Sequence, residues 1–453
     1  MALIESLSGI RGVYGKDLDD SVATRYGYAY AEFLRKRGKK IKVVIGRDTR
    51  ESGEMLRSSI IDGLCCDIID VGISPTPCIS NAVREYKADG GVIITASHNE
   101  PEFNGFKFLE RDGSLLGPED VAGLIEKYHS LAGMDEEEFL TNLYSGSREV
   151  RNIAKMDSID PYRKAIRKHI GRSRTKIVID PNGGAGIRCI EILNSINARY
   201  INTQPGKFSR KVEPGKESLS YLQAEIKKHK AEFAVGFDCD ADRIEILMKD
   251  GNLISGNQIL ALIVDGILSE TKNPELCTVV ANTATSYVVK ELVEMHNARW
   301  KEVDVGEINI VKAMLDFNSP VGGEGSSGGV IIPPSRCRDG ILALSYLLGM
   351  IEKKSKSLAE MVSALPEYYY IKEKVKLRKS FSIDKVKGYF LKNGYLLEEA
   401  GQEGSIKAVK GNSWLLLRQS RTESEILRII ADSKDSLEAK ALIKLGKKLV
   451  SGI

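Results

Sequence analysis

Three carboxylates stand at alternate positions in one short run of the chain. Asp238, Asp240 and Asp242 are separated by single small residues, and Arg243 follows at once. The apolar run before them, residues 233–237, is typical of a short buried strand, so we expect the acids to leave the strand together in a loop. Carboxylates suit a hard divalent cation such as Mg²⁺, which binds a few of them together with a phosphate group. The alternative is a solvated acidic loop, because such loops are common.

A polar loop with a serine follows another apolar strand, residues 91–94. Ser97 and His98 come just after it, where an open α/β sheet builds its site. Ser97 lies in no G-x-S-x-G motif and the chain has only five histidines, so a hydrolase triad is not indicated. A serine that carries a phosphoryl group instead needs a metal ion and cations nearby, and Lys107 could supply a cation or relay a proton. The alternative is an ordinary polar loop with a surface lysine.

Two further loops combine glycines, hydroxyls and charges. Residues 322–329 are glycine-dense, which lets the backbone approach a ligand closely, and Glu324 and Ser326 suit sugar hydroxyls. Residues 418–424 follow a strand-like apolar run at 414–417 and combine arginines with hydroxyls, as phosphate-binding nests do. The alternatives are a flexible turn for the first loop and an exposed basic turn for the second.

These loops, in this order, resemble the motifs of the α-D-phosphohexomutase superfamily, which includes phosphoglucomutase, phosphomannomutase and phosphoglucosamine mutase. The family pattern runs from an N-terminal glycine–arginine loop through TASHNP, NGxK, DGDADR and GExSG to RPSGTEP. Besides the sugar and phosphate loops, the matching segments are SGIRG at 8–12, GRDTR at 46–50, TASHN at 95–99, NGFK at 104–107 and DCDADR at 238–243. The resemblance extends to about residue 430, so it covers nearly the whole chain.

The resemblance implies roles for the acids and the serine. Ser97 would be carried as phosphoserine in the active enzyme. Mg²⁺ would be held by Asp238, Asp240 and Asp242 together with an oxygen of the serine phosphate. Arg243 would help to spread the charge of the transferring group.

The resemblance also implies which residues handle protons and substrate. His98, Lys107 and Arg11 are the candidates for proton transfer, and their roles stay undivided. The loop 305–307 is implied to contribute to sugar specificity. The residues implied to contact the substrate are Gly306, Glu324, Ser326, Arg418, Ser420 and Thr422.

The implied activity is that of a Mg²⁺-dependent phosphohexomutase, an isomerase that interconverts hexose 1-phosphate and hexose 6-phosphate. The reaction would pass through the phosphoserine and a hexose 1,6-bisphosphate, which also serves as activator. The fourth domain is expected to hinge near Pro366 so that the bisphosphate can turn over. Glucose, mannose and glucosamine phosphates differ in the substituent at C2. No residue of the sequence indicates which C2 substituent is recognised, so the preferred sugar is not assigned.

The chain also departs from the family pattern. The altered positions are Glu100 and Phe103 for Pro and Tyr, Cys239 for Gly, and Gln419, Arg421 and Ser424 for Pro, Gly and Pro. The sugar loop lacks the terminal His of many members. These changes keep open the alternative of a catalytically weak or inactive sugar-phosphate binding protein of the same fold. A Mg²⁺-dependent phosphatase is a further alternative, but it would leave Ser97 without a role.

Composition limits the remaining classes of protein. A chain of 453 residues is too long for a single ordinary domain. Its 66 Lys and Arg nearly balance its 62 Asp and Glu, which is not typical of a nucleic-acid-binding protein. No apolar run approaches the ~18 residues of a membrane span. Seven cysteines without metal-ligand spacing, and no signal-peptide pattern, favour the cytoplasm. We expect the protein to bind a small-molecule hexose phosphate, and neither nucleic acid nor a membrane. The sequence does not distinguish a monomer from a dimer.

Strand and helix patterns alternate along most of the chain, which predicts an α/β fold. We expect three related α/β domains with mixed sheets around a central cleft, plus a smaller C-terminal α+β domain. The expected domains are 1–150 with the phosphoserine loop, 151–255 with the metal loop, 256–366 with the sugar loop and 367–453 with the phosphate loop. Predicted strands include 41–45, 176–180 and 277–281, and predicted helices include 21–37, 52–66, 118–131 and 435–450. The acidic stretch 134–152 is predicted to be a linker.

Overall fold

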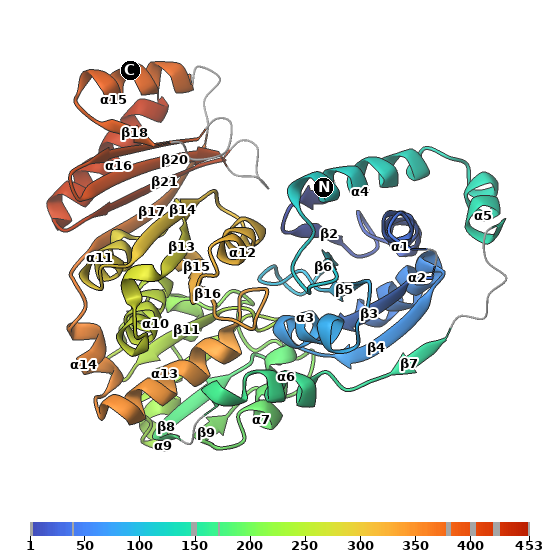
Figure 1. Cartoon of the computed structure of the whole chain (residues 1–453), viewed down its shortest axis with the longest axis horizontal. Coiled ribbons are helices and arrows are strands. Elements are labelled where there is room, and N and C mark those ends of the chain that lie inside the picture. The colour runs from blue at the N-terminus through green and yellow to red at the C-terminus, as the bar shows by residue number, and fades with distance from the viewer. Residues whose placement is uncertain are drawn as a thin grey trace. The chain divides into compact units, whose positions relative to one another are not determined.

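The computed structural model forms two compact units (Figure 1). The first comprises Met1–Ile254 and Ile331–Lys356, and the second comprises Ser255–Val330 and Ser357–Ile453. The structure describes residues 3–38, 40–145, 152–170, 173–376, 382–398, 405–419 and 426–451. Across these ranges no helix is long and apolar enough to cross a membrane.

The first sheet of the first unit has seven strands in the order β1-β2-β6-β5-β3-β4-β7. Its strands are β1 (Ile4–Ser6), β2 (Gly9–Val13), β3 (Lys42–Arg47), β4 (Asp67–Ile73), β5 (Gly90–Ile94), β6 (Phe103–Leu109) and β7 (Ile153–Lys155). β3, β4, β5 and β7 run parallel, whereas β6 pairs antiparallel with β5 and β2. The sheet is therefore mixed.

Helices cover both faces of this sheet. They are α1 (Asp20–Arg35), α2 (Gly53–Leu64), α3 (Thr76–Glu85), α4 (Pro118–Ala132) and α5 (Glu136–Ser145). α1 begins at Asp20 because the Asp19 carboxylate accepts a hydrogen bond from the Val22 amide. Val43 and Ile45 belong to the core on the α1 face, whereas Gly46 faces Ile79 of α3. The alternation along β3 thus sets the two faces.

The second sheet of the first unit has the order β12-β11-β10-β8-β9. Its strands are β8 (Ser173–Asp180), β9 (Ile196–Tyr200), β10 (Phe233–Phe237), β11 (Ile244–Met248) and β12 (Leu253–Ile254), and its helices include α6 (Ile159–Ala165), α7 (Cys189–Ile192), α8 (Lys216–Leu219) and α9 (Leu222–His229). β8 runs parallel to β9 and β10, whereas β11 and β12 form an antiparallel hairpin. α13 (Gly340–Lys354), orange in Figure 1, packs on β8 and β11 although it comes much later in the chain.

The second unit holds a third sheet in the order β14-β13-β15-β16. Its strands are β13 (Thr278–Asn282), β14 (Arg299–Val303), β15 (Gly322–Glu324) and β16 (Gly329–Ile331), and its helices are α10 (Gly256–Glu270), α11 (Tyr287–Met295), α12 (Glu307–Asp316) and α14 (Leu358–Ser363). β13 runs parallel to β14 and β15. α10 starts with a capping box between Ser255 and Gln258.

The fourth sheet is antiparallel, in the order β17-β21-β20-β19-β18. Its strands are β17 (Tyr369–Lys376), β18 (Leu396–Glu398), β19 (Ile406–Lys410), β20 (Ser413–Gln419) and β21 (Ile426–Ser433), with helices α15 (Ile383–Lys392) and α16 (Ser436–Ser451). The expected class, three α/β domains followed by a smaller α+β domain, is confirmed. The expected residue boundaries of the four domains stay a prediction.

The linker predicted at 134–152 is wrong, because α5 lies within it. Phe139 and Leu143 of α5 are buried in the core of the first sheet. The acidic residues 136–138 occupy the first turn of α5, where the helix dipole favours negative charge. A helix start was therefore mistaken for a solvated linker.

Candidate active site

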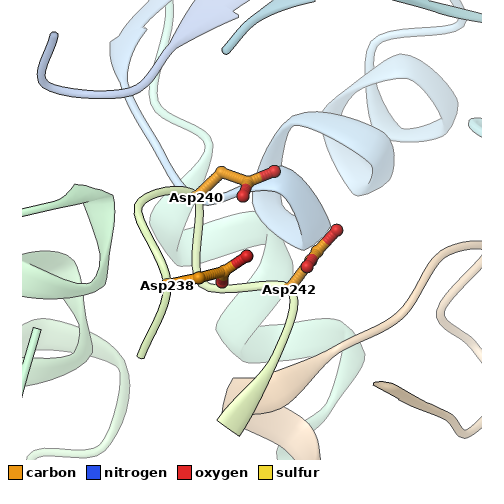
Figure 2. A group of neighbouring side chains, drawn as sticks. All are labelled: Asp238, Asp240 and Asp242. Carbon is orange, nitrogen blue, oxygen red and sulfur yellow. The ribbon is translucent and has the colours of Figure 1, made fainter. Parts of the chain in front are cut away.

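The three aspartates lie together after the buried strand β10. Figure 2 shows Asp238, Asp240 and Asp242 leaving one loop, and one oxygen of each lies within 4.8 Å of the others. All three are fully buried, and Ala241 between them takes a left-handed φ of 56°. The structure thus brings together the three carboxylates that the sequence predicted as metal ligands.

The donor set fits a hard divalent cation. Among the described residues, the Oδ1 atoms of Asp240 and Asp242 accept no hydrogen bond and are shielded from solvent. Buried carboxylate oxygens that accept no hydrogen bond are unfavourable, and a cation bound by oxygen ligands would satisfy them. The Nζ of Lys107 already lies 2.7 Å from Asp240 Oδ2 and 3.1 Å from Asp242 Oδ2.

Neighbouring elements hold the backbone of the aspartate loop. Thr76, at the start of α3, donates from its hydroxyl to Asp240 Oδ2 at 2.6 Å and from its amide to Asp240 O at 2.9 Å. The Ala185 amide donates to Cys239 O at 2.7 Å. A Cβ on Gly184 would lie 2.6 Å from the same carbonyl, so this close approach requires glycine. Sequence reasoning missed Thr76, because it lies far from the aspartates in the chain.

Ser97 faces the aspartates from the end of β5. Its Oγ donates to Asp238 Oδ2 at 3.0 Å, and its side chain is fully buried. Ser97 has a left-handed φ of 51°, which is uncommon for a residue with a Cβ. The predicted phosphoserine position and the predicted metal loop are therefore in direct contact.

Three cationic side chains surround the aspartates. Arg243 Nε lies 3.5 Å from Asp242 Oδ1, and Arg338 Nη2 lies 2.7 Å from Asp242 Oδ2. Although burial opposes it, Arg338, Lys107 and Arg243 hold the pKa of Asp242 well below its usual value. Burial, with Asp242 and Asp240 close by, raises the pKa of Asp238 instead.

Arg338 is a second residue that sequence reasoning missed. It precedes Asp339, whose carboxylate caps α13 by accepting from the Leu342 amide. An arginine next to a helix cap is only a weak indication of a functional site. Because Arg338 is separated from Asp242 by 96 positions, the sequence did not indicate that the two side chains meet.

Arg11 and His98 complete this group. Arg11, on β2, donates to Asn99 Oδ1 at 2.8 Å, and burial, followed by Arg243, lowers its pKa to about 10. Burial, followed by Arg243 and Arg11, lowers the pKa of His98 far below its usual value, so the imidazole is neutral. The first unit therefore holds every predicted catalytic and metal-binding residue.

The predicted sugar loop lies in the second unit. Glu324, at the end of β15, accepts hydrogen bonds from Asn282 Nδ2 at 2.9 Å and from the Gly306 amide at 3.2 Å. Gly306 has a φ of 134°, a conformation that favours glycine. The Ser326 side chain is hydrogen-bonded to the Tyr370 hydroxyl. Gly306 and Glu324, both predicted to contact substrate, are thus brought together.

The phosphate loop begins at the end of β20. Arg418 is largely buried there and lies opposite Arg428 of β21. Ser420 and Thr422, with the altered positions Arg421 and Ser424, lie outside the described residues.

Comparison with known proteins places these features in one family. Residues 4–132, 156–251 and 255–369 match the families described as phosphoglucomutase/phosphomannomutase, alpha/beta/alpha domains I, II and III, respectively. The chain is 34% identical to a phosphoglucomutase/phosphomannomutase of Thermococcus kodakarensis, over 98% of this chain and 97% of that protein. It is 30% identical to a probable phosphoglucosamine mutase of Pyrococcus abyssi, over 98% and 96%.

A solved structure supports the same fold. A phosphoglucomutase/phosphomannomutase family protein from Burkholderia thailandensis superposes with a TM-score of 0.83 at 22% identity, covering 99% of this chain and 98% of that one. The relatives cover nearly the whole length of this chain, and the three family matches lie between residues 4 and 369. The chain therefore belongs to the phosphoglucomutase/phosphomannomutase family of isomerases.

Proposed function

We propose that this protein is a Mg²⁺-dependent phosphohexomutase that interconverts hexose 1-phosphate and hexose 6-phosphate. The contact of Ser97 Oγ with Asp238 Oδ2, at 3.0 Å inside the buried aspartate cluster, carries the proposal. Phosphoryl transfer depends on positioning and charge stabilisation, and a serine beside a cation site surrounded by Lys107, Arg243 and Arg338 supplies both.

Asp238, Asp240 and Asp242 would hold Mg²⁺ together with the phosphate carried on Ser97. When bound, the ion would neutralise charge on the transferring phosphoryl group. Arg243 and Arg338 would add positive charge on the same side, because both lie within 4 Å of Asp242.

Ser97 would exchange its phosphoryl group with the sugar in two transfers. A hydroxyl oxygen of the hexose monophosphate attacks phosphorus, the bond from phosphorus to Ser97 Oγ breaks, and the hydroxyl proton passes to the protein. The hexose 1,6-bisphosphate then turns over, and its other phosphoryl group returns to Ser97. His98, Lys107 and Arg11 are the candidates for the proton transfers.

The second unit would recognise the substrate. Glu324, Ser326 and Gly306 would contact sugar hydroxyls, and their contacts with Asn282 and Tyr370 support a fixed loop. Arg418, Ser420 and Thr422 would bind the non-reacting phosphate, which turns remote binding into positioning of the reacting oxygen. The relatives carry names with different sugars, so we propose the substrate as a hexose phosphate without choosing among glucose, mannose and glucosamine. We expect the activity in the cytoplasm.

Phosphorus NMR of the purified protein would test the proposal. The substrates would be glucose-, mannose- and glucosamine-1-phosphate, with Mg²⁺ and a trace of the matching 1,6-bisphosphate. We expect conversion of at least one to its 6-phosphate, and none with Ser97→Ala. Binding of these sugar phosphates without any conversion, in folded protein phosphorylated on Ser97, would favour an inactive sugar-phosphate binding protein. Release of free phosphate without isomerisation would favour a phosphatase.

A further inference from the structure

The guanidinium of Arg50 is buried beneath the Ser97 loop. Its Nη2 donates to Ser97 O at 2.9 Å and to Asn99 O at 2.6 Å. Its Nη1 donates to Glu100 O at 2.7 Å and to Phe103 O at 2.9 Å. One side chain therefore binds four main-chain carbonyls of a single turn, between the end of β5 and the start of β6.

Asp48 holds this guanidinium in place. Arg50 Nε donates to Asp48 Oδ2 at 3.0 Å, and the Arg50 amide donates to Asp48 Oδ1 at 2.9 Å. The Thr95 hydroxyl donates to Asp48 Oδ2 at 2.6 Å and accepts from the Ser97 amide at 2.8 Å. Asp48 and Arg50 therefore fix both the amide and the carbonyl of Ser97.

The chemistry of the turn explains why an arginine is needed. Residues 97–102 belong to no strand or helix, so the carbonyls of Ser97, Asn99 and Glu100 lie outside the regular ladders, and Ser97 takes a left-handed conformation. Buried carbonyls require donors, and a planar guanidinium offers five N–H groups in a fixed fork. A lysine carries the same charge on a flexible stem, but it cannot match that geometry.

The same segment also touches the aspartate loop. Thr49 Oγ1 lies 4.0 Å from Cys239 Sγ, and Cys239 stands between two of the aspartates. Residues 48–50 thus contact both the turn that carries Ser97 and the loop that carries Asp238.

We propose that Arg50 is a positioning residue that holds the main chain of Ser97 so that its Oγ stays beside Asp238, whether or not that oxygen carries a phosphoryl group. It acts through the four carbonyls and does not touch the substrate. The inference rests on the proposed role of Ser97 as the phosphoryl carrier. Because a displacement of about 1 Å can slow a reaction about 100-fold, loss of the fork should lower kcat much more than it changes KM.

The test compares Arg50→Lys with a matched control, Arg57→Lys. Arg57 belongs to the same unit and donates from Nε and Nη2 to Asp70 Oδ2 at 3.1 and 2.6 Å, away from the Ser97 turn. The measurements are kcat and KM for the hexose 1-phosphate that the wild type converts, Tm, and amide hydrogen exchange of residues 95–106.

We expect Arg50→Lys to lower kcat about 100-fold with KM within about twofold, and to speed exchange in 95–106. Arg57→Lys should lower Tm and keep kcat. A kcat loss below about tenfold in Arg50→Lys, or an equal loss in Arg57→Lys, overturns the inference.

Asp48→Asn keeps the test decisive if Arg50→Lys does not fold. It leaves the arginine in place but removes the charge that holds it, so kcat should fall at least about tenfold with KM unchanged. An unchanged kcat overturns the inference. An inactive wild type would instead count against the proposed function, and hydrogen exchange would still report whether Arg50 holds the turn.

Discussion

The ammonium group of Lys107 lies 2.7 Å from Asp240 Oδ2, inside the buried aspartate cluster. It also lies 3.1 Å from Asp242 Oδ2, so one lysine offsets part of the negative charge that a divalent cation would meet. Lys107 is therefore expected to stabilise the buried carboxylates when no metal is bound, and to weaken the binding of a divalent cation there.

Lys107→Met should separate these two effects. Without the ammonium group, Tm measured in EDTA should fall, because buried carboxylates lose a partner. Added Mg²⁺ should restore Tm and bind several-fold more tightly by calorimetry, while kcat falls at least about 100-fold. Lys249→Met, which removes an exposed lysine 3.6 Å from Glu232, is the control. Weaker Mg²⁺ binding in Lys107→Met would show that the two cations do not compete.

Asp240→Asn should reduce metal binding without disturbing the loop. The Thr76 hydroxyl can still donate to the amide oxygen, so the fold is retained, while one carboxylate charge is lost. We expect a rightward shift in the Mg²⁺ titration of activity and a kcat loss of at least about 100-fold. Asp250→Asn, on the exposed turn between β11 and β12, should match the wild type. An unchanged Mg²⁺ titration for Asp240→Asn would remove the loop as the metal site.

Sequence reasoning succeeded where neighbours in the chain are neighbours in space. The strand at 233–237 leads directly into the aspartates, so their shared loop could be predicted. The roles of Arg50 and Arg338 could not, because their contacts depend on how distant elements pack. The packing of Ile331–Lys356 in the first unit could not be predicted either. The apolar face of α13 is compatible with packing on either sheet, so its sequence does not indicate which one it covers.

Arg418→Ala should weaken substrate binding more than catalysis. Loss of a charge-assisted contact with the distal phosphate, worth about 1.5–3 kcal/mol, predicts a KM raised about ten- to a hundredfold. Initial rates over a range of hexose 1-phosphate concentrations would measure this. Arg428→Ala, opposite Arg418 on β21, controls for losing an arginine from this sheet. A wild-type KM in Arg418→Ala would exclude it from the phosphate site.

Asp432 joins the fourth sheet to the third through the start of α11. Its Oδ1 accepts from Ser286 Oγ at 2.8 Å, and its Oδ2 accepts from the Tyr287 amide at 2.6 Å. Burial raises its pKa to about 6. In the unfolded chain the value is about 3.9, so between these pKa values the folded state binds more protons. The contribution of Asp432 to the free energy of unfolding is therefore largest at low pH and is lost as pH rises through about 6.

Asp432→Asn should remove this pH dependence. From about pH 4 to about pH 7, the wild type should lose on the order of 2–3 kcal/mol relative to the variant. Urea unfolding of both proteins at several pH values would give the difference between their free energies of unfolding. The contributions of the other titrating groups are the same in both proteins and cancel in that difference. Asp435→Asn, just beyond β21 and free of contact with α11 among the hydrogen bonds of the described residues, is the control. Parallel pH profiles for the wild type and Asp432→Asn would mean that Asp432 does not titrate in this range.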